Sequence, residues 1–323
     1  MNGLRAVDRL DVLVLVDNAT DSLSTTPTYV VQEWAGLLAA GRLPTLAGSA
    51  ICHAHHGLSL LLTAHVGDEQ RTLLLDAGPE AATLLHNAAI LGVDFGSVDA
   101  VALSHGHWDH GGGLLAAVEA IAQRRRGFAC YLHLGMFAQR ATTRPDGTMY
   151  VNERLPNPDD LAKAGANVVV TRDPQLVAES VFWVSGEIPR RTPYEEGVPG
   201  HVRRSADGQS WDPDPLIMDE RFVAVRVKDK GVMVFSSCSH AGIVNVLTHA
   251  CDASPAPLFG AMGGLHLSGV TEKIIPDTVR DLKPFALKLF APGHCTGWRA
   301  LTAMAREFGD ELAPSAVGKR YLL

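Results

Sequence analysis

Short apolar runs and amphipathic segments follow one another along most of the chain. Strands are predicted at residues 10–16, 59–63, 72–75, 100–103, 130–134, 222–227, 232–236, 258–262 and 287–291, and near 317. Apolar residues at helical spacing predict helices at residues 34–40, 81–91, 114–125, 243–250, 275–282 and 298–308. The apolar period separates the two kinds of segment. We interpret the pattern as an α/β fold.

Residues 137–216 differ from the rest of the chain. They are rich in Pro, Gly, Arg and Asp, and their only apolar runs are short ones at 168–170 and 181–184. Long irregular segments in enzymes often form lids or binding loops. We therefore predict a substrate-covering insertion around residues 137–216. No Pro/Ser-rich linker divides the chain, so residues 1–323 are interpreted as a single domain.

Composition narrows the classes of partner. The chain has 323 residues, is 46% hydrophobic and carries a formal charge of -7. Its one basic run, at 124–126, ends a predicted helix, where positive charge complements the helix dipole. This argues against a nucleic-acid partner, although a local pocket for one small anion stays open.

The cysteines and the N-terminus indicate a cellular compartment. Five cysteines are scattered and odd in number, which argues against a disulfide framework. The apolar run at residues 12–16 is too short for a signal-peptide core, and no run approaches membrane-spanning length. We predict a soluble cytoplasmic protein with no membrane partner.

The strongest chemical signal directly follows a predicted strand. Four potential metal ligands lie within six residues: His105, His107, Asp109 and His110. Imidazole nitrogen and carboxylate oxygen bind zinc and similar divalent ions. His105 and His107 are two apart on an extended segment and can converge on one ion, while the next two ligands can reach a second. The glycines at 111–113 are expected to let the backbone turn into the next helix.

Three later histidines share one context. His240, His266 and His294 each close an apolar strand and precede a helix. Strand ends from both halves of a sandwich can meet at one rim, and a two-metal site needs about two or more protein ligands for each ion. Each histidine is therefore a candidate ligand, with a hydrogen-bonded structural role as the alternative.

Four motifs together resemble the metallo-β-lactamase fold superfamily. They are residues 103–114, Cys238-Ser-His-Ala-Gly-Ile-Val-Asn245, Gly263-Gly-Leu-His-Leu267 and Pro292-Gly-His-Cys-Thr-Gly297. Within the superfamily they are similar to the branch labelled 7,8-dihydropterin-6-methyl-4-(β-ribofuranosyl)aminobenzene-phosphate synthase-like. The resemblance extends along most of the chain and implies a four-layer αββα sandwich. Because one fold hosts many chemistries, the branch label says little about the substrate.

The resemblance also implies roles for individual residues. His294 matches the superfamily's last ligand and is expected to complete the second site, with His240 completing the first. Asp76 stands in an Asp-x-Gly that is common in the superfamily, which implies that it orients a ligand histidine. His56 lies in a matched segment, 56–59, as a substrate contact or, alternatively, a packing residue. The pair at 17–18 is either a strand-end turn or part of the site.

The chain departs from the superfamily's usual ligand set at two places, and the role of a third residue stays open. Cys238 falls where an aspartate or cysteine ligand usually stands, and is either a thiolate ligand or a buried thiol beside His240. The usual third histidine is missing, and Asp219 or Glu220 is a possible replacement. His266 is either a ligand or a catalytic substrate contact.

A further segment suggests substrate binding. Gly186-Glu187-Ile188-Pro189-Arg190 matches the same branch, and Glu187 follows a strand-like run, so we expect it to face the site. Pro189 restricts the backbone and gives Arg190 and Arg191 a defined direction. A guanidinium can bind a phosphate or carboxylate through two hydrogen bonds, so one of these arginines is predicted to bind an anionic substrate group. The alternative is two solvated loop arginines.

These observations lead to one main functional hypothesis. The chain is expected to be a dinuclear metal-dependent hydrolase, with zinc favoured and manganese or iron as alternatives. A metal-bound hydroxide would attack a small ester, lactone or phosphoester, with Asp109 orienting it or taking its proton. The alternatives are a pterin-related transferase, as the branch label implies, and a non-hydrolytic sensor or redox protein.

Overall fold

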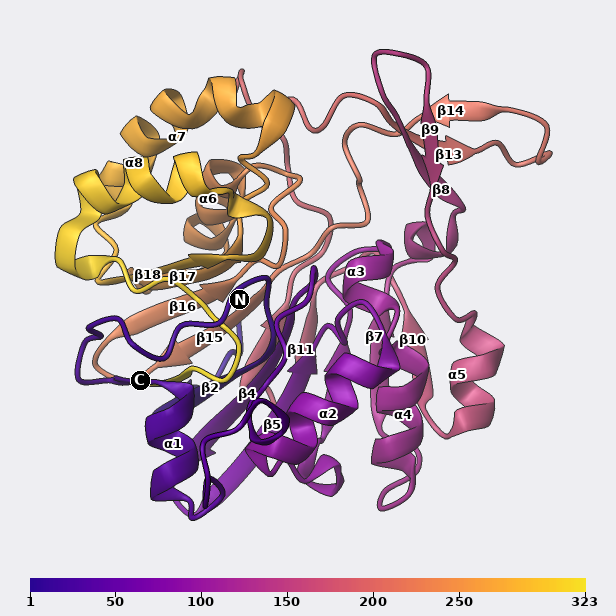
Figure 1. The fold of residues 1–323 in the computed structure, drawn as a ribbon. Coiled ribbons are helices and arrows are strands. Elements are labelled where there is room, and N and C mark those ends of the chain that lie inside the picture. The colour runs from indigo at the N-terminus through magenta and orange to yellow at the C-terminus, as the bar shows by residue number, and fades with distance from the viewer.

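Two large β-sheets pack face to face in the computed structural model, which describes residues 1–323 (Figure 1). The first sheet has eight strands in the order β10-β7-β6-β5-β4-β2-β19-β3. Their bounds are β2 (Arg9–Val16), β3 (Val30–Val31), β4 (Ser59–Val66), β5 (Glu69–Leu75), β6 (Ala100–Ala102), β7 (Ala129–Leu132), β10 (Asn167–Val170) and β19 (Arg320–Leu322).

The second sheet has the order β11-β12-β15-β16-β17-β18, and β1 also pairs with β15. Its strands are β1 (Ala6–Val7), β11 (Gln175–Val177), β12 (Phe182–Val184), β15 (Val223–Val227), β16 (Gly231–Phe235), β17 (Leu258–Gly264) and β18 (Leu289–Gly293).

Side chains alternate between the two faces of each strand, and this alternation explains how the sheets pack against each other on one face and against helices on the other. In β4, Leu60 and Leu62 point into the core between the sheets, whereas Leu61 points to the opposite face, among residues of the outer helices. In β16, Met233 joins the central core and Val234 the outer cluster. Strands covered on both faces read as nearly continuous apolar runs, which is how they appeared in the sequence.

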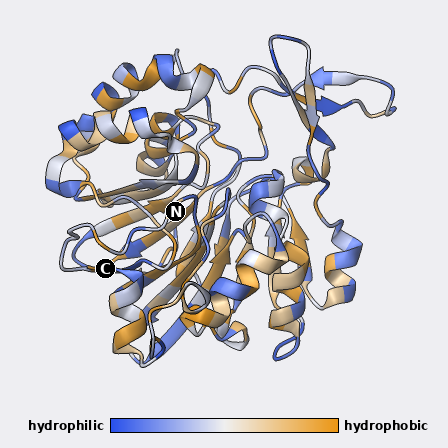
Figure 2. Ribbon diagram, viewed as in Figure 1, coloured by the Kyte–Doolittle hydropathy of each residue, from blue (hydrophilic) through white to orange (hydrophobic).

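Helices cover the outer faces of both sheets. The first sheet is covered by α2 (Ala81–Leu91), α4 (Leu114–Ala122) and α5 (Pro158–Ala164), and the second by α6 (Ile243–Ala253), α7 (Ile275–Leu282) and α8 (Trp298–Phe308). The two remaining α-helices are α1 (Glu33–Ala39) and α3 (Trp108–Gly111). The strands and the inner faces of the helices are mostly apolar in Figure 2, and the outer faces of the helices are mostly polar. The predicted four-layer αββα sandwich is confirmed.

A third, four-stranded sheet projects from the sandwich. It has the order β14-β13-β8-β9 and lies at the upper right of Figure 1. We call it the arm, and its strands are β8 (Arg140–Thr143), β9 (Met149–Val151), β13 (His201–Arg204) and β14 (Trp211–Pro213).

The structure narrows the predicted insertion at 137–216. Three strands of this segment, β10, β11 and β12, are part of the two large sheets. The chain therefore crosses from one sheet to the other inside the segment, because the two apolar runs noted in it are sandwich strands. Only the arm lies outside the sandwich.

Two further expectations concern the last strand and membrane-spanning segments. The last strand is β19, a few residues beyond the position expected near 317. None of the helices has the length and apolar character that crossing a membrane requires.

Candidate metal centre

The candidate ligands lie where strands of both sheets end. His105 follows β6, which runs parallel to β5 and β7. Cys238, His266 and His294 follow β16, β17 and β18, three neighbouring parallel strands of the second sheet. Sites in α/β proteins commonly form beyond the carboxyl ends of parallel strands. Here the loops from both sheets meet at one rim.

The first group of ligands is made of His105, His107 and His240. The Nε2 atom of His105 lies 3.0 Å from Nδ1 of His107 and 3.1 Å from Nε2 of His240. All three side chains are buried, and one ligand atom of each lies within 4.8 Å of the others. Burial and the neighbouring imidazoles lower the pKa of each ring well below its usual value. At neutral pH these rings are therefore neutral, the form that binds metal ions.

The second group is made of Asp109, His110 and His294. The Nε2 atoms of His110 and His294 are 3.2 Å apart, and Oδ2 of Asp109 lies 3.4 Å from Nε2 of His294. Burial by itself lowers the pKa of His294, but Cys295 and Asp109 raise it well above its usual value. This group therefore favours a positive charge at its centre.

Hydrogen bonds on the outer side of the rings test whether these groups fit metal ions. Nδ1 of His110 donates to Oδ2 of Asp76 (2.8 Å), and Nδ1 of His294 donates to Oδ1 of Asn18 (2.9 Å). Ser104 Oγ donates to the same Asp76 oxygen (2.8 Å) and so accepts from Nδ1 of His105 (2.9 Å). These partners assign the tautomers.

The assigned tautomers leave lone pairs facing each other. With Nδ1 protonated, the neutral ring carries a lone pair on Nε2. The facing Nε2 atoms of His110 and His294 then cannot hydrogen-bond to each other without an added proton. A cation between such nitrogens removes this conflict, and outer oxygen partners of this kind are typical of histidines that bind metals. The residues present therefore fit two divalent ions.

Asp219 and Glu220, considered as replacements for a missing ligand, instead support the loops. Oδ2 of Asp219 accepts a hydrogen bond from the backbone N–H of Gly106 (2.8 Å). Glu220 accepts from the backbone N–H groups of His240 (2.8 Å) and Ala241 (2.6 Å), and burial raises its pKa to about 7. Neither carboxylate belongs to a group that could hold a metal. The correction is that both fix the backbone beside the first group.

The glycines after the ligand motif have a different role from the one expected. Gly112 has φ -62°, an ordinary helical value. A Cβ atom there would lie only 1.8 Å from the carbonyl oxygen of Pro79. The absent side chain therefore permits close packing of two backbones and is not needed for an unusual turn.

Four non-glycine residues around the site have left-handed backbone conformations. They follow β5, β16, β17 and β18, and are Asp76 (φ 60°), Ser239 (φ 54°), His266 (φ 46°) and His294 (φ 45°). Such conformations cost energy and concentrate at functional sites, where surrounding contacts hold them.

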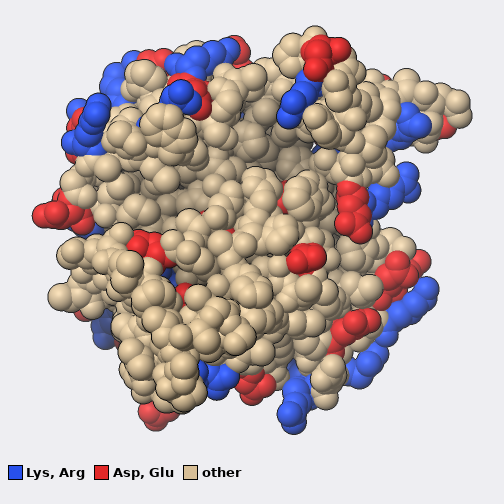
Figure 3. Space-filling model, in the orientation of Figure 1, with Lys and Arg blue, Asp and Glu red and all other residues tan.

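A polar cleft of about 330 Å³ leads to both groups. Asp109 lines it, and His56 stands at its edge with Nε2 3.4 Å from Oδ2 of Asp109. Asn18 donates to Nδ1 of His56 (3.1 Å), so the pair at 17–18 is part of the site. No Lys or Arg lines the cleft. Figure 3 shows a hollow between the arm and the helices of the second sheet, with Lys and Arg mainly toward the edge of that face.

His201 is a cleft residue that the sequence did not reveal. It lies on β13 of the arm, and its ring centre is 5.3 Å from that of His107 and 5.5 Å from that of His240. Its Nδ1 atom is buried and has no hydrogen-bond partner. A single histidine in a loop-rich segment gives no local signal, because only the folded arm brings it to the ligands.

Arg140 fixes the arm against the ligand loop. Its guanidinium is buried, forms an ion pair with Asp219, and lies 3.0 Å from Oδ2 of Asp214. Its Nη1 also donates to the carbonyl oxygen of Gly106 (3.3 Å), between the two first ligands. The arm is therefore a fixed wall of the cleft.

Glu187 does not face the cleft as predicted. Its carboxylate lies 3.2 Å from Nε2 of His133 and 3.7 Å from Nε of Arg172, and the residue is absent from the cleft lining. The correction is that Glu187 pairs with neighbouring basic side chains.

Arg190 and Arg191 are also not at the cleft. Arg190 donates to the carbonyl oxygens of Ile188 (2.5 Å) and Leu216 (2.6 Å), so it closes the loop on itself. Arg191 forms an ion pair with Asp252 on α6. Pro189 does give them a defined direction, but it is away from the ligands. The structure therefore corrects the prediction that they bind an anionic substrate.

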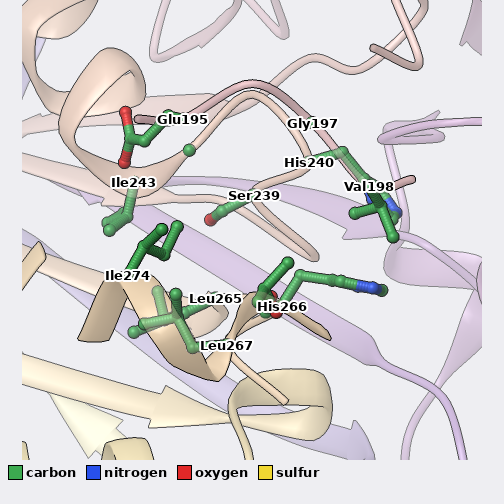
Figure 4. A pocket seen from close by; sticks show the side chains of 12 residues that line it. Glu195, Gly197, Val198, Ser239, His240, Ile243, Leu265, His266, Leu267 and Ile274 are labelled. Carbon is green, nitrogen blue, oxygen red and sulfur yellow. The ribbon is translucent and has the colours of Figure 1, made fainter. Parts of the chain in front are cut away.

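A second, much smaller cavity lies beside His240 and His266 (Figure 4). Its volume of about 20 Å³ is close to that of one water molecule, too small for a substrate. Glu195, at its far side, accepts hydrogen bonds from the backbone N–H groups of Val244 (2.9 Å) and Asn245 (2.8 Å). This carboxylate fixes the first turn of α6, directly after the His240 loop.

Replacing Asp76 with asparagine should weaken metal binding by about 10- to 100-fold, the usual effect of removing an outer partner of a ligand histidine. The substitution keeps the size of the side chain but can place an NH₂ group opposite Nδ1 of His110. The imidazole of His110 would then have to carry its proton on Nε2, the atom that faces His294 within the second group. Metal titration should measure the loss. An affinity equal to that of wild type would contradict the assigned tautomer, and a thermal melt would check the fold.

Comparisons with known proteins show what the chain is similar to in sequence. A family model described as Anti-Pycsar protein Apyc1 matches residues 44–132. The chain is 28% identical to the 7,8-dihydropterin-6-methyl-4-(beta-D-ribofuranosyl)-aminobenzene-5'-phosphate synthase of Methanocaldococcus jannaschii, over 82% of this chain and 89% of that protein.

Two solved structures share the fold. Tm1679, described as a metal-dependent hydrolase of the beta-lactamase superfamily, aligns with a TM-score of 0.69 at 21% identity, over 96% of this chain and 98% of its own. The metallo-beta-lactamase fold protein YhfI from Bacillus subtilis aligns with a TM-score of 0.50 at 13% identity, over 98% and 100%. The resemblance stated from the sequence motifs is confirmed.

Proposed function

We propose that this chain, which has the metallo-β-lactamase fold, is a hydrolase that uses two divalent metal ions on a small ester, lactone or phosphoester. The observation that carries the proposal is the pair of adjacent ligand groups, in which buried ring nitrogens from several loops converge closely enough to hold metal ions. Both groups border one polar cleft, so bound substrate and ions would be neighbours.

In this proposal His105, His107 and His240 hold one ion, and Asp109, His110 and His294 hold the other. Cys238 is a candidate shared ligand, because its Sγ lies within 4.8 Å of ring nitrogens from both groups. Nitrogen, carboxylate and thiolate donors together favour zinc, with manganese or iron as alternatives. When bound, the ions would lower the pKa of a coordinated water and polarise the attacked oxygen.

The chain's own residues would bind and orient the reactants. Burial alone raises the pKa of Asp109, but His110 and His294 lower it below its usual range, so the carboxylate is ionised at neutral pH. A carboxylate with a low pKa is a weak base, so Asp109 is better suited to accept a hydrogen bond and orient the attacking water. His56, 3.4 Å from its Oδ2, can shift a proton toward the cleft mouth. His266 remains a catalytic candidate from its place in the lining.

The cleft restricts the substrate. A volume of about 330 Å³ suits a small molecule. Because no Lys or Arg lines the cleft, negative charge on the substrate would be balanced by the metal ions alone. This favours a neutral ester or lactone, or a phosphoester of low charge.

The transferase alternative has one specific support. The synthase of M. jannaschii is similar to this chain over most of both lengths. This alternative predicts that the chain forms the pterin–aminobenzene conjugate for which that relative is named.

The test combines metal analysis with substrates. Protein purified without chelator should contain about two divalent ions per chain. It should hydrolyse at least one of an aryl ester, an acyl lactone and an aryl phosphodiester, lose that activity with chelator, and regain it with metal. Mass-spectrometric detection of the conjugate, without hydrolysis of any of these compounds, would favour the transferase. A metal-free, fully active preparation would overturn both.

Replacing His201 with alanine should raise KM about tenfold, the value of about one hydrogen bond, while kcat and metal content change little. The reason is that His201 lines the cleft from the arm and not from a ligand loop, and that its buried Nδ1 has no hydrogen-bond partner within the protein. The measurement is steady-state kinetics on the compound that wild type hydrolyses. His201→Gln, which keeps a hydrogen-bonding group, should recover part of the loss. Loss of metal in the alanine variant would instead make His201 part of the ligand set.

A further inference from the structure

Two of the five cysteines meet inside the candidate metal centre. Cys238 and Cys295 follow different strands, β16 and β18, yet their sulfur atoms lie 3.0 Å apart. His266 contacts both: its Nδ1 lies 3.4 Å from Sγ of Cys238, and its backbone N–H donates to Sγ of Cys295 (3.3 Å). All five cysteines are free thiols in the structure.

The two sulfur atoms are close enough for a disulfide to form with a small movement. A disulfide has its sulfurs about 2.05 Å apart, so these two need to approach by only about 1 Å. The backbone beside them leaves the space that this pairing uses: a Cβ at Gly264 would lie 2.6 Å from Sγ of Cys295. Both thiols are buried against the protein interior but line the cleft, so a small oxidant can reach them.

We propose that Cys238 and Cys295 are a dithiol that a peroxide oxidises reversibly to a disulfide, and that this disulfide and the metal ions exclude each other. In the first step one thiol attacks hydrogen peroxide, giving a sulfenic acid and one water. In the second step the other thiol attacks the sulfenic sulfur, forming the S–S bond and releasing a second water. The two thiols together lose two electrons and two protons, and the peroxide is reduced to two waters.

The position of Cys238 couples the dithiol to the ligand groups. Its sulfur lies within 4.8 Å of ring nitrogens of His105 and His110, one from each group. Forming the disulfide would commit this sulfur to Cys295 and remove it as a donor to an ion. By linkage, a bound ion must then oppose oxidation to the same extent that the disulfide weakens ion binding. This coupling rests on the proposed metal site, whereas disulfide formation does not.

The first part of the test counts thiols in the metal-free full chain. Stoichiometric hydrogen peroxide should reduce the alkylatable thiols from five to three, and a dithiol reductant should restore them. Peptide mapping of the wild-type protein should find Cys238 linked to Cys295. Cys251→Ser, which removes the exposed cysteine, should still lose two thiols, whereas Cys295→Ser should form no disulfide and lose at most one thiol, as a sulfenic acid on Cys238. No loss of thiols in wild type, a link through Cys251, or irreversible sulfinic acid would overturn the dithiol.

The second part measures zinc binding to reduced and oxidised wild type. The disulfide form should bind zinc about 5- to 150-fold more weakly, the usual range of coupling between two sites. Zinc-loaded protein should resist peroxide in the thiol count. Equal affinities of the two forms would overturn the exclusion and leave the dithiol standing. Failure of the reduced protein to bind zinc, manganese or iron would overturn the metal site and the exclusion together, while the peptide map still decides the dithiol.

Discussion

Replacing His110 with alanine should remove about one of the two bound ions and lower hydrolytic activity by at least about 100-fold, beyond the effect of losing an outer partner of a ligand. Asp109→Ala should do the same. Both side chains belong to the second ligand group and lie within α3, whereas His105 and His107 precede this helix. The first group keeps all three of its histidines in either variant. Elemental analysis and the hydrolysis assay measure the two effects.

The matched control is His53→Ala. His53 is exposed, stacks on His86, and belongs to no ligand group, so its removal should leave both ions bound. Circular dichroism should show the same secondary structure in all variants. Equal loss of both ions from His110→Ala and from His105→Ala would argue that the two sites are strongly coupled or are a single site.

Replacing Arg140 with alanine should lower the free energy of unfolding by about 3–5 kcal/mol, the usual cost of removing one partner from a buried ion pair. The change leaves the buried carboxylates of Asp214 and Asp219 without their guanidinium. It also frees the arm from Gly106, so metal affinity should fall as well. Chemical denaturation measures the first effect and metal titration the second.

Arg125→Ala provides the comparison. Arg125 pairs with Asp99 at 2.7 Å, but it is half exposed, and a surface pair of this kind contributes about 0–1 kcal/mol. A similarly small effect of Arg140→Ala would contradict the role given to the buried pair. Proteolysis within the arm should increase in the Arg140 variant and stay unchanged in the Arg125 variant.

The strands, the helices and the α/β class could be predicted because each element carries its own local pattern, whereas the four-layer arrangement was implied by the resemblance to the metallo-β-lactamase superfamily. The runs at β4 and β16 are apolar on both faces, and the apolar residues of α2 and α4 have helical spacing. The sequence of each of these elements therefore indicates which of its faces is buried. The ligand motif from His105 to His110 was equally local. Two histidines two apart on extended backbone share a side whatever the rest of the chain does.

Roles that depend on contacts between distant segments could not be assigned in this way. Asp219 was considered as a ligand because of its position before a hairpin, but Arg140 of the arm and the backbone of Gly106 engage it. Arg190 is expected at the cleft, but the carbonyl oxygens of Ile188 and of Leu216, 26 residues further along the chain, accept its hydrogen bonds elsewhere. A motif shows which residue types are close in sequence, but it does not show which distant groups will form hydrogen bonds or ion pairs with them.

By itself the sequence determined the α/β class, the strand ends at which the candidate ligands lie, the residue types that can bind metal ions, and the motifs whose resemblance implied the four-layer sandwich. Only the tertiary structure decided that His201 reaches the cleft from the arm, and that Cys238 and Cys295 meet across two strand ends. The physical reason is the difference in sequence distance over which these interactions act. Periodicity and spacing act over a few residues, whereas these contacts join segments many residues apart, whose meeting is set by the packing of the two sheets and the anchoring of the arm.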